Sequence, residues 1–236
     1  MRLASCVRLV LGLAAATLAT TVAPAPSRAQ MQPNKTEIRG YKGLFASVIK
    51  GELDETRKLL AAGAKVDETD AEGRTPLHIA AYRRERDIAR VLVKAGANPR
   101  ATDKRGYDIL TIAAVRDDLE FVKLAIELGA DPKAIVGTYG GTALHTAAQL
   151  GHASIVAALA KAGAPVNLAN KAGWTPLIET IVLGEGTSQH LEAVKALLAA
   201  GANPNIADRS GASPLALARR KGFTAIAEAI AKAGGK

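Results

Sequence analysis

The chain has 236 residues, with 31 lysines and arginines against 22 aspartates and glutamates, for a formal net charge of +9 at pH 7. This length allows one or two domains, and the single cysteine, Cys6, excludes a disulfide or a thiolate metal cluster within the chain. H-E-x-x-H, G-x-x-x-x-G-K-S/T and G-x-S-x-G motifs are also missing. We therefore expect a protein with no catalytic residues, no metal site and no cofactor.

The first segment has the features of a secretory signal peptide. A basic leader, "MRLASCVR", precedes the apolar run "LVLGLAAATLATTVA", and "SRAQ" offers Ala29 before a cleavage site. The run is too short for an ordinary transmembrane helix, although an uncleaved anchor is an alternative. We expect residues 1–29 to be a signal peptide that is cleaved near Ala29 on export to the periplasm. Residues 30–36 then form a short lead-in, and the mature chain keeps 28 basic and 22 acidic residues.

From residue 37 onward one unit recurs. The dipeptide "GA" returns at intervals of 33 to 38 residues, and "GG" takes its place at the end of the chain. The segments between these glycines include "GRTPLHIAA", "GYDILTIAA", "GGTALHTAA", "GWTPLIETI" and "GASPLALAR". Each opens a short apolar helix, and a second helix such as "LEAVKALLAAGANP" follows. Periods of this size indicate stacked supersecondary units.

The ends of these helices are marked by residues with suitable backbone preferences. A threonine or serine before the first helix can accept a hydrogen bond from a free amide, and a proline at the first helical position loses no hydrogen bond there. The capping candidates are Thr75, Thr142, Thr175 and Ser213. A glycine after the second helix ends it in the left-handed conformation. The sequence therefore predicts an all-α chain of paired helices.

Two of these segments, "GRTPLHIAA" and "VLVKAGANP", resemble the consensus of the ankyrin repeat almost residue for residue. The resemblance covers residues 37–236 and suggests an exported bacterial ankyrin repeat protein. It implies an ankyrin-repeat solenoid of about six helix-turn-helix units with β-turn fingers. The expected units are 37–69, 70–102, 103–136, 137–169, 170–207 and 208–236, and the first and last depart from the consensus as capping units do.

Two insertions interrupt the repeat. One extra residue lies in "DPKAIVGTYGG", before the fourth unit, and about five lie at 184–188, where they lengthen the turn of the fifth unit. Insertions in repeat proteins map to loops, often on a functional side, but tolerated surface insertions are equally consistent with this pattern.

The four histidines are the first candidates for chemistry. His78 and His145 close "TPLH" and "TALH", where the ankyrin resemblance implies a hydrogen bond to the backbone between units. His152 and His190 match one another at the start of the second helix. We expect scaffold roles for all four, because a general base must be oriented against a substrate. Hydrolysis at the long turn, with Glu185 or His190 as the base, is the weakest alternative.

The resemblance also implies where a partner binds, namely at the finger tips and at the exposed end of each first helix. Those positions hold eleven basic residues against one acid, Glu72, together with all four tyrosines and the single tryptophan. Such a charge distribution attracts anionic partners, and Tyr, Trp and Arg dominate interface energies. Plain solvation of charged positions is the competing explanation. The residues that we predict to bind a partner are Arg74, Tyr82, Arg83, Lys104, Arg105, Tyr107, Arg116, Tyr139, Lys171, Trp174 and Arg209.

These observations favour a non-catalytic protein–protein interaction module in the periplasm. It would bind the acidic surface of another exported protein and act as a scaffold, an inhibitor or an accessory of an enzyme. The alternative is binding to anionic lipids or glycans of the cell envelope. We expect a monomer and no nucleic-acid partner, because export removes the chain from nucleic acid.

Overall fold

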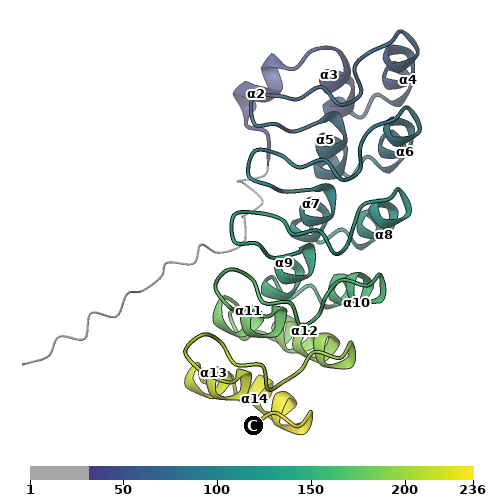
Figure 1. Cartoon of the computed structure of the whole chain (residues 1–236). Coiled ribbons are helices and arrows are strands. Elements are labelled where there is room, and N and C mark those ends of the chain that lie inside the picture. Colours follow the sequence, from purple (N-terminus) through teal and green to yellow (C-terminus); the bar gives the residue numbers. More distant parts are fainter. Residues whose placement is uncertain (1–31) are drawn as a thin grey trace, which may run out of the picture.

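The computed structural model describes residues 32–236, so the expected signal peptide and its cleavage site lie outside the described residues. The described part contains 13 helices, and its only β pairing is an isolated bridge between Val136 and Gly141. Twelve helices form six antiparallel pairs that stack into one solenoid, with the first helices in one row and the second helices in another (Figure 1). The predicted all-α solenoid is confirmed.

The first helices of the pairs are α3 (Gly43–Lys50), α5 (Pro76–Arg83), α7 (Ile109–Val115), α9 (Ala143–Gln149), α11 (Pro176–Val182) and α13 (Pro214–Arg220). The second helices are α4 (Leu53–Ala61), α6 (Arg86–Lys94), α8 (Leu119–Glu127), α10 (Ala153–Lys161), α12 (Ser188–Ala199) and α14 (Thr224–Lys232). Among residues 32–236, none of these helices combines the length and the apolar character that a bilayer crossing requires.

One leucine in each first helix anchors the core between the two rows. From the second unit to the fifth it is fully buried, at Leu77, Leu110, Leu144 and Leu177. Burial of such a side chain contributes roughly 1.5–3 kcal/mol. Alanine pairs that follow, such as Ala80 and Ala81, are also fully buried and let neighbouring helices approach closely. The repeat therefore encodes a single continuous core.

The helix starts use more than one kind of cap. Thr175 accepts a hydrogen bond from the amide of Ile178, as predicted from the sequence. In the second unit, by contrast, the amide of Thr75 donates to Nδ1 of His78 (3.1 Å). In the third unit Asp108 caps α7 by accepting the amide of Thr111 (2.8 Å).

An additional helix, α2 (Lys35–Gly40), precedes the six pairs. Asn34 accepts hydrogen bonds from the amides of Thr36 and Glu37, and the Glu37 carboxylate accepts the amide of Asn34 in return. This reciprocal capping box fixes the start of the helix. Part of the expected lead-in is thus helical.

The insertion in the fifth unit is partly helical as well. Helix α12 has 12 residues, whereas α10 has nine, so the extra residues add one helical turn besides the loop. Gly186 lies against the ring of Phe223 in the last unit, and Nζ of Lys221 donates to the carbonyl of Val182 (2.7 Å). The insertion therefore packs against the sixth unit.

Between the helix pairs the chain forms the fingers, which we number by unit: second 70–74, third 103–107, fourth 137–141, fifth 170–174 and sixth 208–212. Backbone hydrogen bonds join consecutive fingers. The amide of Lys104 donates to Glu72 (2.9 Å), that of Gly137 to Gly106 (2.8 Å), and that of Lys171 to Tyr139 (2.9 Å). The second to fifth fingers are therefore connected edge to edge.

Candidate partner-binding face

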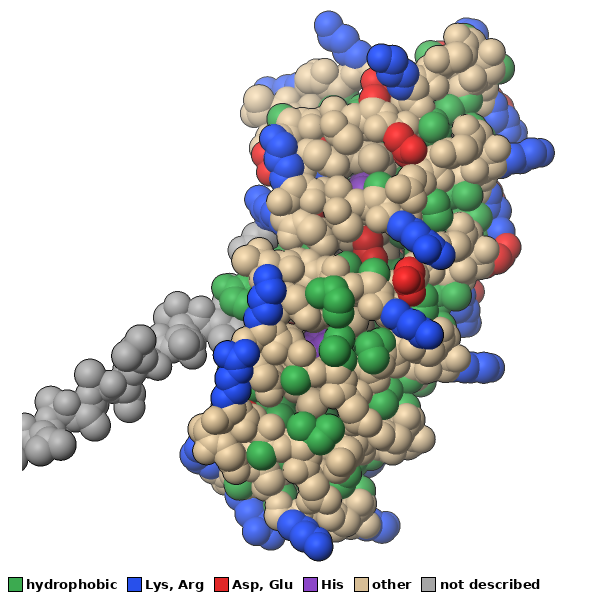
Figure 2. Space-filling view, viewed as in Figure 1, with side chains coloured by type: hydrophobic (Ala, Val, Ile, Leu, Met, Phe, Trp, Pro, Cys, Tyr) green, Lys and Arg blue, Asp and Glu red, His purple; other side chains and the backbone are tan. Residues whose placement is uncertain are grey.

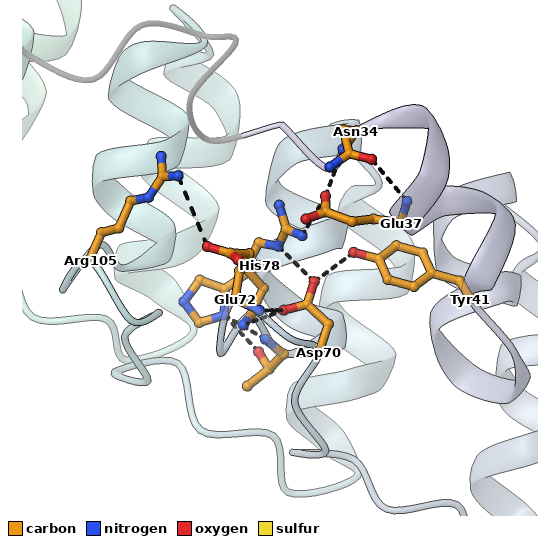
Figure 3. A network of polar contacts seen from close by, with 9 residues as sticks. Asn34, Glu37, Tyr41, Asp70, Glu72, His78 and Arg105 are labelled. Atoms are coloured by element: carbon orange, nitrogen blue, oxygen red, sulfur yellow. Dashed lines mark hydrogen bonds and ion pairs between the residues drawn. The ribbon is translucent and has the colours of Figure 1, made fainter.

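Arg74 does not lie on the accessible surface, which corrects its predicted place among the contact residues. Its side chain is 6% exposed, and its guanidinium pairs with Asp70 (2.7 Å) and Glu37 (2.9 Å). Tyr41 donates its hydroxyl to the same Asp70 carboxylate (2.7 Å; Figure 3). Burial alone raises the pKa of Asp70, but the hydrogen bonds from Tyr41 and Arg74 lower it below its ordinary value. Arg74 therefore binds α2 and the first unit to the second.

Tyr82 is also inside, with 8% of its surface exposed. The guanidinium of Arg116, from the next unit, lies over its ring with the guanidinium carbon 4.8 Å from the ring centroid. This cation–π contact crosses the boundary between the second and third units. The placement of Tyr82 among the accessible contact residues is thus corrected, because Arg116 covers it.

The remaining nine predicted residues reach the surface, and we call them the basic face. Arg83, Lys104, Arg105, Lys171 and Arg209 are exposed, whereas Tyr107, Arg116, Tyr139 and Trp174 are partly buried. Figure 2 shows lysine and arginine side chains following the edge that the fingers form. The role of these nine residues in binding stays a prediction.

At the finger tips, glycines make room for the aliphatic parts of lysine and arginine side chains, which we call the basic stems. The side chain of Lys171 crosses Gly140 of the preceding finger, where a Cβ atom would lie only 3.1 Å from Cγ of the lysine. Gly140 also has a φ of +67°, which favours glycine for a second reason. Lys104 crosses Gly73, and Arg209 crosses Gly173, in the same way. Each stem is therefore partly ordered before any partner binds.

The finger aspartates do not neutralise these cations. Oδ1 of Asp103 accepts the amides of Arg105 and Tyr107 (both 2.9 Å). Oδ1 of Asp208 accepts the amide of Ala212 at 3.0 Å and, in the same way, closes the sixth finger. Because these carboxylates are turned toward the backbone, the finger tips keep a positive charge.

Ion pairs are distributed unevenly over the molecule. On the second helices, Lys123 pairs with Glu120 at 2.7 Å, and Lys195 pairs with Glu192 at 2.8 Å. Beside the basic face, Glu72 of the second finger lies 4.0 Å from Arg105. The other exposed arginines and lysines of the basic face have no ion-pair partner among residues 32–236, namely Arg83, Lys104, Lys171 and Arg209.

Cations beside the basic face serve the scaffold instead. Arg84 and Arg86 both pair with the buried Asp118 of the next unit, at 3.4 and 2.6 Å. Arg84 also donates to the carbonyl of Arg116, at the C-terminal end of α7, where a cation is favourable to the helix dipole. Arg84 and Asp117 hold positive φ angles of 63° and 52° without being glycine.

All four histidines bind backbone carbonyls, as expected for scaffold roles, and those of His78, His152 and His190 lie in a neighbouring unit. Nε2 of His78 lies 3.1 Å from the carbonyl of Tyr107, and Nε2 of His145 lies 3.1 Å from that of Leu168. The other two contacts are His152 to Ala114 (2.8 Å) and His190 to Gln149 (3.0 Å). Burial lowers the pKa of His145 to about 4, so its ring is neutral at pH 7. Within residues 32–236, no cluster of three or more potential ligands could hold a metal ion.

One buried acid escaped the sequence analysis. Glu179 lies in α11 with 8% of its surface exposed, and Asn170 of the fifth finger donates to its carboxyl group (2.8 Å). Burial raises the pKa of Glu179 to about 7, although the Asn170 hydrogen bond opposes that change. The signal was available in "GWTPLIETI", where a glutamate stands in a place that is aliphatic in "GRTPLHIAA".

The stacked pairs, the connected fingers and the inter-unit histidine bonds define a helical-repeat solenoid protein. The family whose model matches residues 6–103 and 110–208 is described as "Ankyrin repeats (3 copies)". The chain therefore belongs to the ankyrin repeat family. Ankyrin repeats generally mediate protein–protein interaction, and proteins built from them are typically non-catalytic.

Known relatives agree with this assignment. The chain is 35% identical to the ankyrin repeat protein YahD of Escherichia coli (strain K12) over 97 residues, which are 41% of this chain and 48% of that protein. The chain thus spans about half the length of this curated relative. An ankyrin repeat domain from Acinetobacter baumannii AYE is 36% identical, with a TM-score of 0.76 over 82% of this chain and 98% of that one. The ankyrin repeat domain of Bcl-3, a member of the IkappaB family, is 28% identical, with a TM-score of 0.75 over 84% and 88%.

Proposed function

We propose that the chain is a non-catalytic interaction module of the periplasm that binds an acidic surface of another protein through its basic face. The observation that carries this proposal is the uneven distribution of ion pairs. Six of the nine lysines and arginines on the second helices pair with a carboxylate, whereas Lys104, Lys171 and Arg209 at the finger tips have no ion-pair partner among the described residues. Such a row of cations raises the local concentration of anionic partners and speeds their encounter.

Affinity would come from a few anchors on the same face. Trp174, Tyr107 and Tyr139 are partly buried, so each keeps some accessible surface while its neighbours restrain it. Restrained aromatic side chains lose little conformational entropy on binding and commonly carry much of the interface energy. The module would then act as a scaffold, an inhibitor or an accessory of an enzyme, and it would work as a monomer.

A second candidate is binding to an anionic lipid or glycan surface of the envelope. Basic side chains on the third, fifth and sixth fingers favour it, because an extended anionic surface suits a row of cations. Such binding depends on charge alone and weakens steeply with salt. Removal of the indole of Trp174 would leave binding to such a surface unchanged, whereas it would weaken a protein complex that Trp174 anchors.

The test is affinity capture from a periplasmic extract at about 0.1 M salt, where the screening length is ~10 Å. The bait is the mature chain, residues 30–236. One variant replaces the finger-tip cations Lys104, Arg105, Lys171 and Arg209 with glutamine. The matched control removes the same charge from the other side of the solenoid, at the exposed lysines Lys94, Lys133, Lys161 and Lys232.

A protein retained by the unmodified bait and the control, but lost from the finger-tip variant, would support the proposal and identify the partner. Retention by all three baits would contradict it. If vesicles containing anionic lipid are bound with the same dependence while no protein is captured, the second candidate takes its place.

A further inference from the structure

Glu179 occupies a position that is mostly apolar in the other units. The equivalent residues, counted from the start of each first helix, are Ala46, Ile79, Ile112, Thr146 and Leu217. The last four are buried, as Glu179 is. A carboxyl group therefore replaces a mainly aliphatic contact inside the solenoid, directly behind the fifth finger.

Asn170 connects this carboxyl group to the finger. Its Nδ2 donates to Oε2 of Glu179 (2.8 Å), while its Oδ1 accepts the amides of Ala172 (2.9 Å) and Trp174 (3.1 Å). The amide of Asn170 also donates to the carbonyl of Trp174 (2.9 Å). One side chain thus closes the finger with its oxygen and holds Glu179 with its nitrogen.

The other fingers show why an asparagine is needed here. The second, third and sixth fingers have an aspartate at this place, namely Asp70, Asp103 and Asp208. An aspartate accepts the same backbone amides but has no donor for a neighbouring carboxyl group. At position 170 it would oppose Glu179 with a second negative charge. The asparagine and the glutamate therefore depend on one another.

Glu179 has no charge partner for its ionised form. Helix α11 packs against α9, α12 and α13. The titratable and charged groups on these elements and on the fifth finger are His145, His190, Glu192, Lys195, Arg219, Arg220 and Lys171. The pKa of Glu179 responds to burial first, which raises it to about 7, and then to the Asn170 hydrogen bond, which lowers it; no charge from those elements contributes.

We propose that Glu179 is a positioning residue for the fifth finger: the closed arrangement, in which Asn170 joins the buried carboxyl group to the finger, is favoured when that group is protonated. Ionisation favours an open arrangement in which water reaches the carboxylate, because the cost of burying the charge exceeds the gain from the stronger Asn170 hydrogen bond. An ionised carboxylate with a single hydrogen bond is costly in a buried site, and admission of water between α11 and the finger relieves that cost. The finger carries Lys171 and Trp174, so the consequence for partner binding rests on the proposed function. The movement of the finger itself does not depend on the proposed function.

Trp174 makes the movement measurable without a partner. It is the single tryptophan of the chain, and both its amide and its carbonyl bind Asn170. The experiment records the emission maximum and iodide quenching of the full chain between pH 5 and pH 9. We expect one transition with a midpoint near pH 7, with a red shift and stronger quenching on the alkaline side. An emission spectrum and a quenching constant that stay constant over this range would overturn the proposal.

Glu179→Gln removes the titration but keeps an oxygen that can accept from Asn170. We expect the transition to disappear and the emission to stay in its acid-side form. Persistence of the transition in this variant would overturn the proposal, because another group, such as a histidine, would then be responsible.

A double variant, Asn170→Asp with Glu179→Ile, supplies a second test if the glutamine variant fails to fold. It reproduces the combination that the third unit uses, with Asp103 and Ile112, and it should fold without a transition. A transition that remains in the double variant would count against the proposal. The finger-tip variant separates this inference from the proposed function. If it keeps the fluorescence transition but no longer captures the partner, the proposed function is supported. If it keeps both the transition and the capture, the proposed function is contradicted and the inference about Glu179 is not.

Discussion

Each buried ionisable side chain of this molecule is stabilised by the partners it finds. Arg74 has two carboxylates, and His145 has a donor at one ring nitrogen and an acceptor at the other. Glu179 has a single amide donor. The two carboxylates favour the ionised form of Arg74, whereas burial favours the neutral forms of His145 and Glu179 in spite of their hydrogen bonds. These differences give measurable consequences at the level of single residues.

The free energy of unfolding should respond to pH through His145 and Glu179 in opposite directions. The pKa of His145 is lowered to about 4, so its contribution is complete above the ordinary histidine value of 6.5 and is lost as the pH falls through 4. The pKa of Glu179 is raised to about 7, so its contribution is complete below 4.5 and is lost as the pH rises through 7. Between pH 4.5 and 6.5 the two effects oppose one another.

Glu179→Gln should therefore make stability rise more steeply with pH over that interval, by up to about 1.4 kcal/mol per pH unit. Urea unfolding at a series of pH values measures the slope. Glu192→Gln, at an exposed carboxylate on the second helix of the same unit, is the matched control and should leave the slope unchanged. Parallel profiles for all three proteins would show that Glu179 has an ordinary pKa in the folded state.

Arg74→Met should destabilise the fold by about 3 kcal/mol, because it leaves Asp70 and Glu37 without their cation in a mostly buried site. Chemical denaturation measures the loss. Arg83→Met is the control, since this exposed arginine has no ion-pair partner among the described residues, and its effect should stay within about 0.5 kcal/mol. Equal effects of the two substitutions would mean that the Arg74 network contributes no stability.

At the scale of elements, neighbouring units hold one another through the turns between their helices. Arg84 reaches from the second unit to the third, and His152 reaches from the fourth back to the third. Two of these turns have a non-glycine residue in the left-handed conformation, at Arg84 and Asp117, where other units have Gly51, Gly151 and Gly222. Such residues cost free energy that their contacts have to offset.

Asp117→Gly should raise the stability by roughly 0.5–1 kcal/mol, because it removes backbone strain and loses only a weak contact. The carboxylate is about half exposed and lies 3.8 Å from His152. Arg84→Gly should not give this gain, since it also removes the bond to Arg116 and the pair with Asp118. Thermal unfolding of both variants measures the difference, and a lower midpoint for Asp117→Gly would show that the His152 contact outweighs the strain.

The order and type of the elements follow from local patterns, which is why they were predicted. Caps, prolines and glycines lie within one unit, and the core leucines recur at a fixed place. The burial of Arg74 and Tyr82 depends instead on contacts with Glu37 and Arg116, which lie in neighbouring units more than 30 positions away in the chain. A repeat pattern gives the same expectation for every unit, so it does not reveal which copy is covered by its neighbour. The extra turn of α12 also escaped prediction, and the loop before it packs against Phe223, which is likewise a contact between units.

At the scale of the whole molecule, the predicted route of export decides which partners the basic face can meet. A mature chain that begins at Gln30 should be recovered from the periplasmic fraction of a bacterial host. Mass spectrometry of the intact protein identifies the N-terminus. A full-length chain retained in the membrane fraction would indicate the uncleaved anchor instead, and a chain confined to the cytosol would contradict export.

The hydrogen bonds between the second to fifth fingers, together with the helix stacking that continues to the sixth unit, also fix the spacing of the basic face. Stacked helices lie about 8–10 Å apart, so successive finger tips are spaced at roughly that interval. From the third finger to the sixth the tips present Lys104 with Arg105, then Tyr139, then Lys171, then Arg209. Under the proposed function the solenoid selects its partner by the spacing of groups on the partner's surface. A matching surface offers an acid, an apolar group and two further acids in that order and at that spacing. A surface with the same charge but a different spacing of these groups binds less well.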